Sequence, residues 1–342
     1  MMRGESEKID FVIIWVDGND PAWQKEKKHY LGMLNEETSR DIDAGNVRYR
    51  DWDNLKYWFR AVEKYAPWVN KVHFVTCGQK PDWLNVEAPK LHLVHHKDYI
   101  PAEYLPTFSS HPIELNLHRI EDLSEHFVYF NDDFFLTAPV EKKDFFVGGL
   151  PCDCIEEEPV EFPRCELYNS IRINDIVFMN RHFDRQRCRH ENKEKWYSLK
   201  TPHSTAKNIL TGCLKNKYFF GMAIHHLPQA YCKETLKAVW ENEPEWMHET
   251  CSHRFRDSRD ISQHVFKFWQ LMTGQFYPYD KRKFGKALPV DTKLDEICEA
   301  IQKQKYKAIC INDADAADFE QAKKRVIEAF EKVLPEKSSY EL

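Results

Sequence analysis

Two adjacent carboxylates follow a short apolar run in the first half of the chain. Residues 127–130 read Phe-Val-Tyr-Phe, and Asn131, Asp132 and Asp133 come directly after them. A continuous apolar run of this length is typical of a strand buried on both faces of a mostly parallel sheet. Two ionised carboxylates at its end repel each other and are costly to bury, and a divalent cation resolves both problems. Their oxygen atoms suit Mg²⁺ or Mn²⁺, and such an ion in turn holds a phosphate.

Two alternatives stay open for this pair. An Asn-Asp-Asp turn with both acids in water explains the same residues without a ligand. Successive side chains of an ideal strand also point in opposite directions. Asp132 and Asp133 therefore hold one ion together only if the backbone turns there, and otherwise one of them is free to act as a general base.

Other carboxylates are also expected at strand ends. Residues 9–16 predict a buried strand that ends in a turn containing Asp17, Gly18 and Asp20, and for Asp20 alone an ordinary tight turn is the favoured explanation. Residues 306–311 predict a last strand, followed by Asp313. Ligands of open α/β sheets bind at the carboxyl ends of strands, which makes Asp17 and Asp313 site candidates.

A helix expected after Leu105 carries two imidazoles and a carboxylate in line. His111, Glu114 and His118 are spaced i, i+3 and i+7, so they share one face of a helix that continues to Ile120. Such a stripe is either an exposed polar face or the lining of a site.

Two further groups of residues could bind or activate an anion. His226 ends a short apolar run at residues 224–228. Arg254, Arg256 and Arg259 precede an apolar helix predicted at residues 261–272. Guanidinium groups near the amino terminus of a helix favour phosphate binding, although each arginine alone is an ordinary surface residue.

The elements that position these residues predict an α/β fold. Leu55, Trp58, Phe59 and Val62 form one apolar helix face, with Asp51 as the expected cap. Strands predicted at residues 71–77 and 91–96 follow this helix, so the order implies parallel βαβ units and a mostly parallel sheet. Residues 141–222 carry weaker signals and predict an insertion or lid whose charge runs are solvated surface.

Composition limits the class of protein. The chain has 342 residues, of which 42% are hydrophobic, and its net charge is -6, from 49 Lys and Arg against 55 Asp and Glu. The acidic balance argues against a nucleic-acid-binding protein. We find no apolar stretch long enough to span a bilayer, no apolar signal core in residues 1–10, and ten cysteines without the spacing of a zinc site. A cytoplasmic protein with reduced thiols is expected.

Four separated blocks, taken together, resemble the Stealth family of sugar-phosphate transferases. The resemblance covers most of the chain and is weakest at residues 141–222. Its blocks are IDFVIIWVDGND at residues 9–20; RYRD at 48–51, YAPWV at 65–69, GQKPDWLN at 78–85, LPTFSS at 105–110 and YFNDD at 129–133; HLP at 226–228 with RDSRD at 256–260; and IND at 311–313.

The resemblance implies a single catalytic domain over residues 1–342. Core blocks at residues 8–140 and 223–335 would form a nucleotide-sugar-binding core similar to the GT-A glycosyltransferases, with residues 141–222 as an insertion or lid. It also implies transfer of a hexose- or N-acetylhexosamine-1-phosphate from a UDP-sugar to a hydroxyl of a glycan acceptor. UMP is then released, and the expected setting is synthesis of a bacterial capsule or exopolysaccharide.

The residues that match the family motifs receive roles on this basis. The catalytic candidates are Asp132, Asp133, His226 and Arg256. The candidates for Mg²⁺ or Mn²⁺ are Asp132, Asp133 and Asp313. The candidates for donor binding are Asp17, Gly18, Asp20, Arg48, His111, Glu114 and Asn131.

Two other functions remain as alternatives. A metal-dependent GT-A-type glycosyltransferase would use the same donor, attack the sugar carbon and release UDP. A sugar-nucleotide-binding module without catalysis would need fewer acids beside an anionic ligand. The sugar, the acceptor hydroxyl, the oligomeric state and a peripheral contact with the inner face of the membrane through residues 141–222 stay open.

Overall fold

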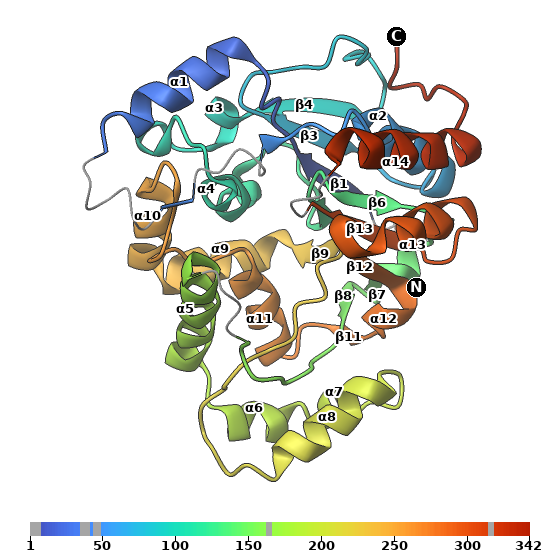
Figure 1. Ribbon diagram of the computed structural model, residues 1–342. Coiled ribbons are helices and arrows are strands. Elements are labelled where there is room, and N and C mark those ends of the chain that lie inside the picture. Colours follow the sequence, from blue (N-terminus) through green and yellow to red (C-terminus); the bar gives the residue numbers. More distant parts are fainter. Residues whose placement is uncertain (1–7, 35–41, 44–48, 162–165, 314–317) are drawn as a thin grey trace, which may run out of the picture.

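The computed structural model describes residues 8–34, 42–43, 49–161, 166–313 and 318–342. Its central sheet has five strands in the order β4-β3-β1-β5-β9 (Figure 1). The first four are parallel and β9 runs antiparallel to β5. Their bounds are β4 Leu91–His95, β3 Val72–Thr76, β1 Ile9–Ile14, β5 His126–Phe130 and β9 Gln229–Cys232. The predicted mostly parallel α/β sheet is therefore confirmed.

A second sheet meets the first at the end of β5. Its order is β12-β13-β6, with β12 and β13 parallel and β6 antiparallel to β13. Their bounds are β12 Gly285–Pro289, β13 Ala308–Asn312 and β6 Phe134–Leu136. The shorter strands are β11 Tyr277–Pro278, β8 Leu150–Asp153 and β7 Phe146–Val147 in one sheet, and β10 Arg256–Asp257 with β2 Ile42–Asp43 in another.

Helices cover both faces of the central sheet (Figure 1). Along β1, Phe11 and Ile13 belong to one apolar core, whereas Val12 belongs to another, as strand alternation requires. The first core includes residues of α2 Leu55–Tyr65, α13 Val290–Gln302 and α14 Phe319–Val333. The second includes residues of α4 Ser110–Leu115, α9 Lys233–Asn242, α10 Pro244–Ser252 and α11 His264–Met272.

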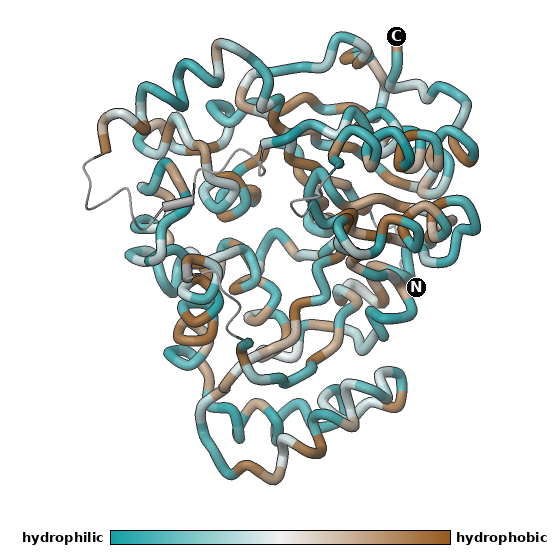
Figure 2. Tube along the Cα trace, viewed as in Figure 1, coloured by the Kyte–Doolittle hydropathy of each residue, from teal (hydrophilic) through white to brown (hydrophobic). Residues whose placement is uncertain are grey.

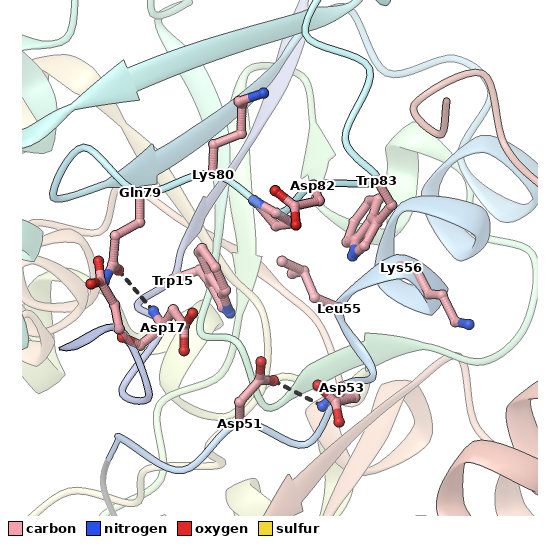
Figure 3. A pocket seen from close by; sticks show the side chains of 12 residues that line it. Trp15, Asp17, Asp51, Asp53, Leu55, Lys56, Gln79, Lys80, Asp82 and Trp83 are labelled. Carbon is pink, nitrogen blue, oxygen red and sulfur yellow. Dashed lines mark hydrogen bonds between the residues drawn. The ribbon is translucent and has the colours of Figure 1, made fainter. Parts of the chain in front are cut away.

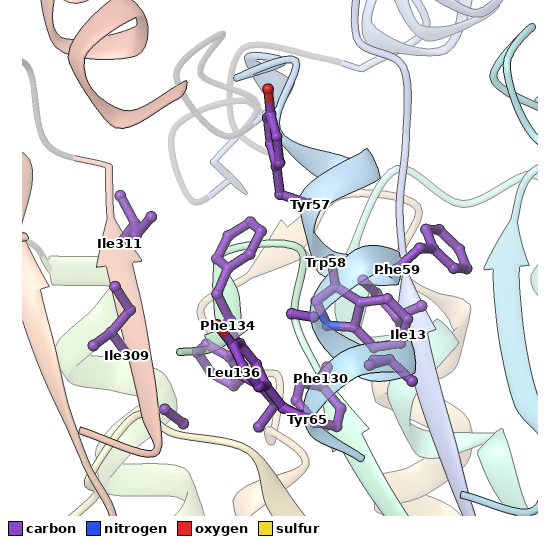
Figure 4. Packing of buried hydrophobic residues seen from close by; sticks show 14 of the residues in the cluster. Ile13, Tyr57, Trp58, Phe59, Tyr65, Phe130, Phe134, Leu136, Ile309 and Ile311 are labelled. Carbon is purple, nitrogen blue, oxygen red and sulfur yellow. The ribbon is translucent and has the colours of Figure 1, made fainter. Parts of the chain in front are cut away.

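Helix α2 fixes the position of the central strands. Its predicted apolar face packs as expected: the ring centroids of Trp58 and Phe130 lie 5.4 Å apart (Figure 4), and those of Phe59 and Phe74 lie 5.6 Å apart. All four side chains are buried. Because these aromatic rings pack against β3 and β5, they hold the carboxyl ends of those strands in place.

The remaining helices lie at the periphery. They are α1 Pro21–Leu31, α3 His96–Tyr99, α5 Glu166–His182, α6 Arg185–Glu191, α7 Lys193–Trp196, α8 Pro202–Gly212 and α12 Lys281–Phe284. Helices α6 to α8 form one end of the molecule, opposite α14 (Figure 1). No helix in the described ranges combines the length and hydropathy needed to cross a membrane. The nine cysteines among the described residues are free thiols.

Candidate active site

Asp132 and Asp133 lie in the turn that joins β5 to β6, where the two sheets meet. The Phe134 N–H donates to the Asn131 carbonyl at 3.1 Å and closes the turn. The backbone therefore turns at the acidic pair, and strict strand alternation does not separate the two carboxylates. The Tyr129 hydroxyl lies within hydrogen-bonding distance of Asn131 Oδ1 and, at 2.8 Å, of Glu114 Oε1. This contact fixes Asn131 against buried polar groups.

Asp132 lies close to two other carboxylates, those of Asp133 and Asp51. Its side chain is exposed to solvent, yet protein surrounds it on most sides. Desolvation is the largest cause that raises its pKa, and the neighbouring Asp133 carboxylate raises it further, to about 7. Asp51 adds a smaller effect in the same direction.

Asp133 pairs with His226 through one oxygen only. Its Oδ2 atom lies 3.6 Å from His226 Nε2 and accepts a hydrogen bond from the Cys310 thiol at 3.2 Å. Its Oδ1 atom is buried and has no hydrogen-bond partner among the described residues. A buried carboxylate oxygen without a donor is costly, which marks it as a position for a ligand.

His226 is held in an uncommon backbone conformation. Its φ angle is +46°, in the left-handed region that residues other than glycine rarely adopt. Its ring packs edge-on against Phe134, with centroids 5.0 Å apart and an interplanar angle of 89°. Burial lowers the pKa of the imidazole, but the Asp133 carboxylate outweighs burial and the pKa is raised overall. The ring is thus oriented by Asp133 and Phe134 while 40% of the side chain stays exposed.

Glu114 and Arg256 complete the surroundings of His226. Both act electrostatically on its imidazole, Glu114 raising the pKa and Arg256 lowering it. The Arg256 Nη2 atom donates to Ser110 Oγ at 2.9 Å, so it bridges β10 to the start of α4. The structure therefore brings together four predicted residues from distant parts of the sequence: Asp133, Glu114, His226 and Arg256.

The prediction that His111, Glu114 and His118 share one face of a continuous helix is wrong. Helix α4 ends at Leu115, and a separate 3-10 turn carries His118. His111 and Glu114 are buried rather than exposed. His111 Nδ1 lies 2.8 Å from one oxygen of the fully buried Asp260, and His253 Nδ1 lies 2.7 Å from the other. His111 thus ties α4 to the segment that carries Arg256.

The three predicted arginines do not converge on one anion site. Arg259 forms a two-point ion pair with Asp257 at 2.8 and 2.9 Å. The Arg254 guanidinium lies 4.9 Å from the ring centroid of Tyr30. Helix α11 begins at His264, three residues later than predicted. Within this group, Arg256 is the arginine that reaches the surroundings of His226.

Asp313 follows β13, as predicted, and binds a guanidinium group. Arg50 donates to both of its oxygens at 3.1 and 3.0 Å, and Trp52 Nε1 donates at 3.1 Å. A metal ion at Asp313 would have to displace this ion pair, so its metal role stays a prediction.

A pocket of about 460 Å³ opens at the carboxyl ends of β1 and β3 (Figure 3). Trp15 and Trp83 lie on its walls, with Asp51 and Asp53 below them. The full lining consists of Trp15, Asp17, Asp20, Asp51, Asp53, Leu55, Lys56, Gln79, Lys80, Pro81, Asp82 and Trp83. Two indole rings and two lysines suit an aromatic, anionic ligand, whereas the excess of carboxylates calls for a cation.

The first predicted turn forms one wall of this pocket. Gln79 accepts from the Asp17 N–H at 2.8 Å and donates to Asp20 Oδ2 at 3.0 Å. Asp20 is also the amino-terminal cap of α1, which is a structural role, and its donor-binding role stays a prediction. A Cβ atom on Gly18 would lie 1.9 Å from the Tyr49 carbonyl oxygen, so only glycine allows this close approach. Arg48, a predicted donor-binding residue, lies outside the described residues.

Asp51 connects the pocket to the acidic turn. It lines the pocket, and its charge raises the pKa of Asp132. The prediction that Asp51 caps α2 is wrong, because Asn54 holds the cap position and Asp51 accepts from the Asp53 N–H at 2.8 Å. Asp51, Gln79, Trp15 and Trp83 were not predicted as site residues. Trp15 directly follows β1, and Gln79 and Trp83 follow β3, so the adjoining carboxyl ends of these strands were the signal for these three residues.

The prediction that the charge runs of residues 141–222 are solvated surface is right only in part: Arg187, Glu191 and Lys193 are exposed, but several other charged residues are buried. Glu156, Glu157 and Arg185 are buried. Arg282 donates to both oxygens of Glu156, and Lys207 lies 2.7 Å from it. Cys154 and His225 lie near Glu156 in an arrangement that three metal ligands could adopt. Two cations already occupy the Glu156 oxygens, which disfavours a metal ion there.

The acidic turn fits a divalent cation better. Asp133 Oδ1 is a buried oxygen without a hydrogen-bond partner in the described part of the chain, and burial together with the Asp133 carboxylate raises the pKa of Asp132. Asp133, His226 and Cys310 also place their ligand atoms within 4.8 Å of one another. Carboxylate oxygens are the ligands that Mg²⁺ and Mn²⁺ prefer.

Fold and site together define an α/β protein with an acidic cleft at the carboxyl ends of its parallel strands. Comparison with known proteins then identifies the family. Residues 7–35 match the model of Stealth protein CR1, conserved region 1, and residues 48–151 match that of Stealth protein CR2, conserved region 2. The chain belongs to the Stealth family, as its sequence blocks predicted.

Relatives match over almost the whole chain. The capsular polysaccharide phosphotransferase WcwK of Streptococcus pneumoniae is 40% identical over 98% of each chain. The receptor polysaccharide phosphotransferase WefC of Streptococcus gordonii is 40% identical over 98% of this chain and 99% of its own. The exopolysaccharide phosphotransferase cps2G of Lactiplantibacillus plantarum is 35% identical over 97% and 96%. These relationships support a transferase.

Proposed function

We propose that this protein transfers a sugar-1-phosphate from a UDP-sugar to a hydroxyl group of a glycan acceptor. The sugar is a hexose or an N-acetylhexosamine, and the product is a phosphodiester with release of UMP. The observation that carries the proposal is the Asp133–His226 pair, which lies beside an acidic turn that is linked through Asp51 to an aromatic pocket. The polysaccharide phosphotransferases that are similar over their full length support the reaction class.

The pocket at β1 and β3 takes the nucleotide. Trp15 and Trp83 offer aromatic faces for the uracil base, and Gln79 keeps the Asp17–Asp20 turn in place. Lys56 and Lys80 add positive charge at the wall for a phosphorylated ligand.

Asp132 and Asp133 would hold Mg²⁺ or Mn²⁺. When bound, this ion neutralises the charge of the diphosphate and of the departing UMP. Asn131 stays fixed by Tyr129, so the turn is preorganised for the ion.

His226 takes the proton of the acceptor hydroxyl. Its Nε2 faces Asp133, which stabilises the imidazolium that forms, and Nδ1 is left to receive the proton. The acceptor oxygen then forms a bond to the phosphorus that carries the sugar, and the bond from this phosphorus to the UMP oxygen breaks. Arg256 stabilises the negative charge that develops on the transferred phosphoryl group.

The decisive measurement is the nucleotide released from a UDP-hexose or UDP-N-acetylhexosamine in the presence of an oligosaccharide acceptor and Mg²⁺ or Mn²⁺. UMP as the product supports attack at phosphorus. UDP as the product would replace the proposal with a glycosyltransferase, and tight donor binding without turnover would replace it with a binding module. Asp132→Asn is expected to abolish release, whereas Glu87→Gln, an exposed carboxylate outside the cleft, leaves it unchanged.

A further inference from the structure

Helix α8 buries polar residues and exposes apolar ones, which is the reverse of an ordinary surface helix. Its polar residues Ser204 and Asn208 are buried, whereas Ile209 and Leu210 are 57% and 73% exposed. Besides Pro202 and His203 in its first turn, the exposed residues of α8 and of its C-cap are spaced i, i+3, i+4 and i+7, which places them on one side of the helix. We call this side the outer face of α8; it consists of Ala206, Ile209, Leu210 and Cys213.

Polar contacts explain why the inner face of α8 is hydrophilic. Ser204 Oγ donates to Glu156 at 2.8 Å, and Thr211 Oγ1 donates to Glu157 at 2.6 Å. Asn208 Nδ2 donates to the Ile155 and Trp196 carbonyl groups at 2.9 and 3.0 Å. The helix is therefore anchored through hydrogen bonds, and its apolar side is not needed to hold it in place.

The apolar surface continues beyond the helix at both ends. Leu199 is 93% exposed, Leu214 is 52% exposed and Tyr218 is 50% exposed. Residues 199–218 thus hold five of the eleven large hydrophobic side chains that are exposed in the described part of the chain. This segment is a small fraction of the 342 residues, so the clustering points to a partner that covers it. Hydrophobic stretches along this end of the molecule are visible in Figure 2.

The charge of the same region is opposite to that of the whole chain. Residues 185–218 contain nine Lys or Arg and two Glu, whereas the whole chain has a net charge of -6. Two of the nine, Arg185 and Arg189, are buried and paired with Glu157, so they do not contribute to the surface charge. Residues 199–218 contain four lysines and no acidic residue. Lys207 is paired with Glu156 and Glu158, but Lys200, Lys215 and Lys217 are exposed. The apolar surface is therefore flanked by positive charge.

We propose that the outer face of α8, with Leu199, Leu214 and Tyr218, docks onto the surface of a lipid bilayer that contains anionic lipids. Apolar side chains would enter the boundary between headgroups and acyl chains, and the exposed lysines would contact the lipid phosphates. A second copy of the chain fits less well. A two-fold contact through this face would bring lysines against lysines, with no carboxylate in residues 199–218 to pair with them.

Two variants separate the apolar from the electrostatic contribution. Ile209→Gln/Leu210→Gln removes the centre of the outer face, and Lys200→Gln/Lys215→Gln/Lys217→Gln removes the exposed charge. All five side chains are exposed, so both variants are expected to fold. The matched controls are Met33→Gln/Val86→Gln and Lys97→Gln/Lys324→Gln/Lys332→Gln, which change exposed residues of the same types elsewhere.

The test is co-sedimentation of the full chain with vesicles of phosphatidylcholine and phosphatidylglycerol, or of phosphatidylcholine alone. The wild-type chain is expected to bind the anionic vesicles and to be released by salt. The lysine variant is expected to lose roughly 100-fold in affinity, since each lysine near an anionic surface contributes about a factor of five. The apolar variant is expected to lose at least about tenfold in affinity, since it removes two large side chains that would be buried in the bilayer.

Two results would overturn the proposal. One is equal vesicle binding by the wild-type chain and both variants, or no binding at all. The other is a dimer of the wild-type chain in sedimentation velocity that the apolar variant abolishes, which would assign this face to a second copy. Vesicle binding needs no turnover, so its outcome is independent of the reaction proposed above.

Discussion

Asp133 Oδ2 lies 3.6 Å from His226 Nε2, and the two residues come from segments that are 93 positions apart in the sequence. The imidazole is also fixed by its edge-on contact with Phe134 and by a left-handed backbone. A strained residue that is held by several contacts is typical of a functional position. This relationship carries the role of His226 as a base.

Replacing His226 by Gln is expected to lower kcat by about 10²- to 10⁴-fold, the usual contribution of a positioned general base. Donor affinity should change little, because His226 lies outside the nucleotide pocket. Steady-state kinetics of UMP release would check both values. A matched His203→Gln variant changes an exposed imidazole on α8 and should retain full activity. A raised KM with unchanged kcat for His226→Gln would contradict the role.

Trp15→Leu is expected to weaken donor binding by about 5- to 150-fold, since stacking of a base on an aromatic ring contributes about 1–3 kcal/mol. Titration calorimetry with UDP would measure this loss. Trp246→Leu removes an indole from α10, outside the pocket, and should leave the affinity unchanged. Equal affinities for the two variants would place the nucleotide elsewhere.

Strands and their ends could be predicted from the sequence because each is a local pattern. The run at residues 127–130 and the acids after it were sufficient to locate β5 and its turn. The partners of those acids could not be predicted in the same way. Asp51 looked like a helix cap because it precedes an apolar helix, and its approach to Asp132 depends on how α2 packs against the sheet.

The burial of charged residues also could not be predicted from local sequence patterns. The acidic run at Glu156 and Glu157 and the basic residues Arg185 and Arg189 are typical of surface when read separately. Glu157 pairs with Arg185 and Arg189 about thirty positions away. Glu156 pairs with Lys207 and Arg282 at larger separations, and no short pattern reveals such pairs. The burial of His111 could not be predicted for the same reason, since its partner Asp260 lies on a distant segment.

Gly18→Ala is expected to lower the free energy of unfolding by about 1–3 kcal/mol, because a Cβ atom would overlap the Tyr49 carbonyl. The segment that must move carries Asp51 into the pocket, so donor affinity should fall as well. Gly32→Ala is the matched control, since its Cβ atom would make only ordinary contacts of 3.4 Å or more. Urea unfolding and UDP titration would measure the two effects. Unchanged donor affinity would show that the position of Tyr49 does not affect the pocket.

Glu157→Gln is expected to lower the free energy of unfolding by about 3–5 kcal/mol, the cost of leaving buried charges unpaired. Glu157 lies 2.5 Å from both Arg185 and Arg189, and all three side chains are buried. The neighbouring Glu158→Gln variant removes a partly exposed contact with Lys207 and should cost less than about 1 kcal/mol. Urea unfolding of both variants provides the comparison. Similar midpoints would show that the buried pairs contribute no more than a surface pair.

The free energy of unfolding is expected to fall at low pH, in part because Asp153 becomes protonated. Burial raises the pKa of this carboxyl, but Lys267 and Lys281 outweigh burial and lower it to about 2. An unfolded aspartate has a pKa of about 3.9, so the charged form stabilises the fold above that pH. This contribution, about 3 kcal/mol, is lost as pH falls from about 4 towards 2. Asp153→Asn mimics the protonated side chain and should be less stable than the wild-type chain near neutral pH. The two urea midpoints should converge in acid, whereas Glu87→Gln should follow the wild-type chain throughout. A constant difference between Asp153→Asn and the wild-type chain across this range would contradict the assignment.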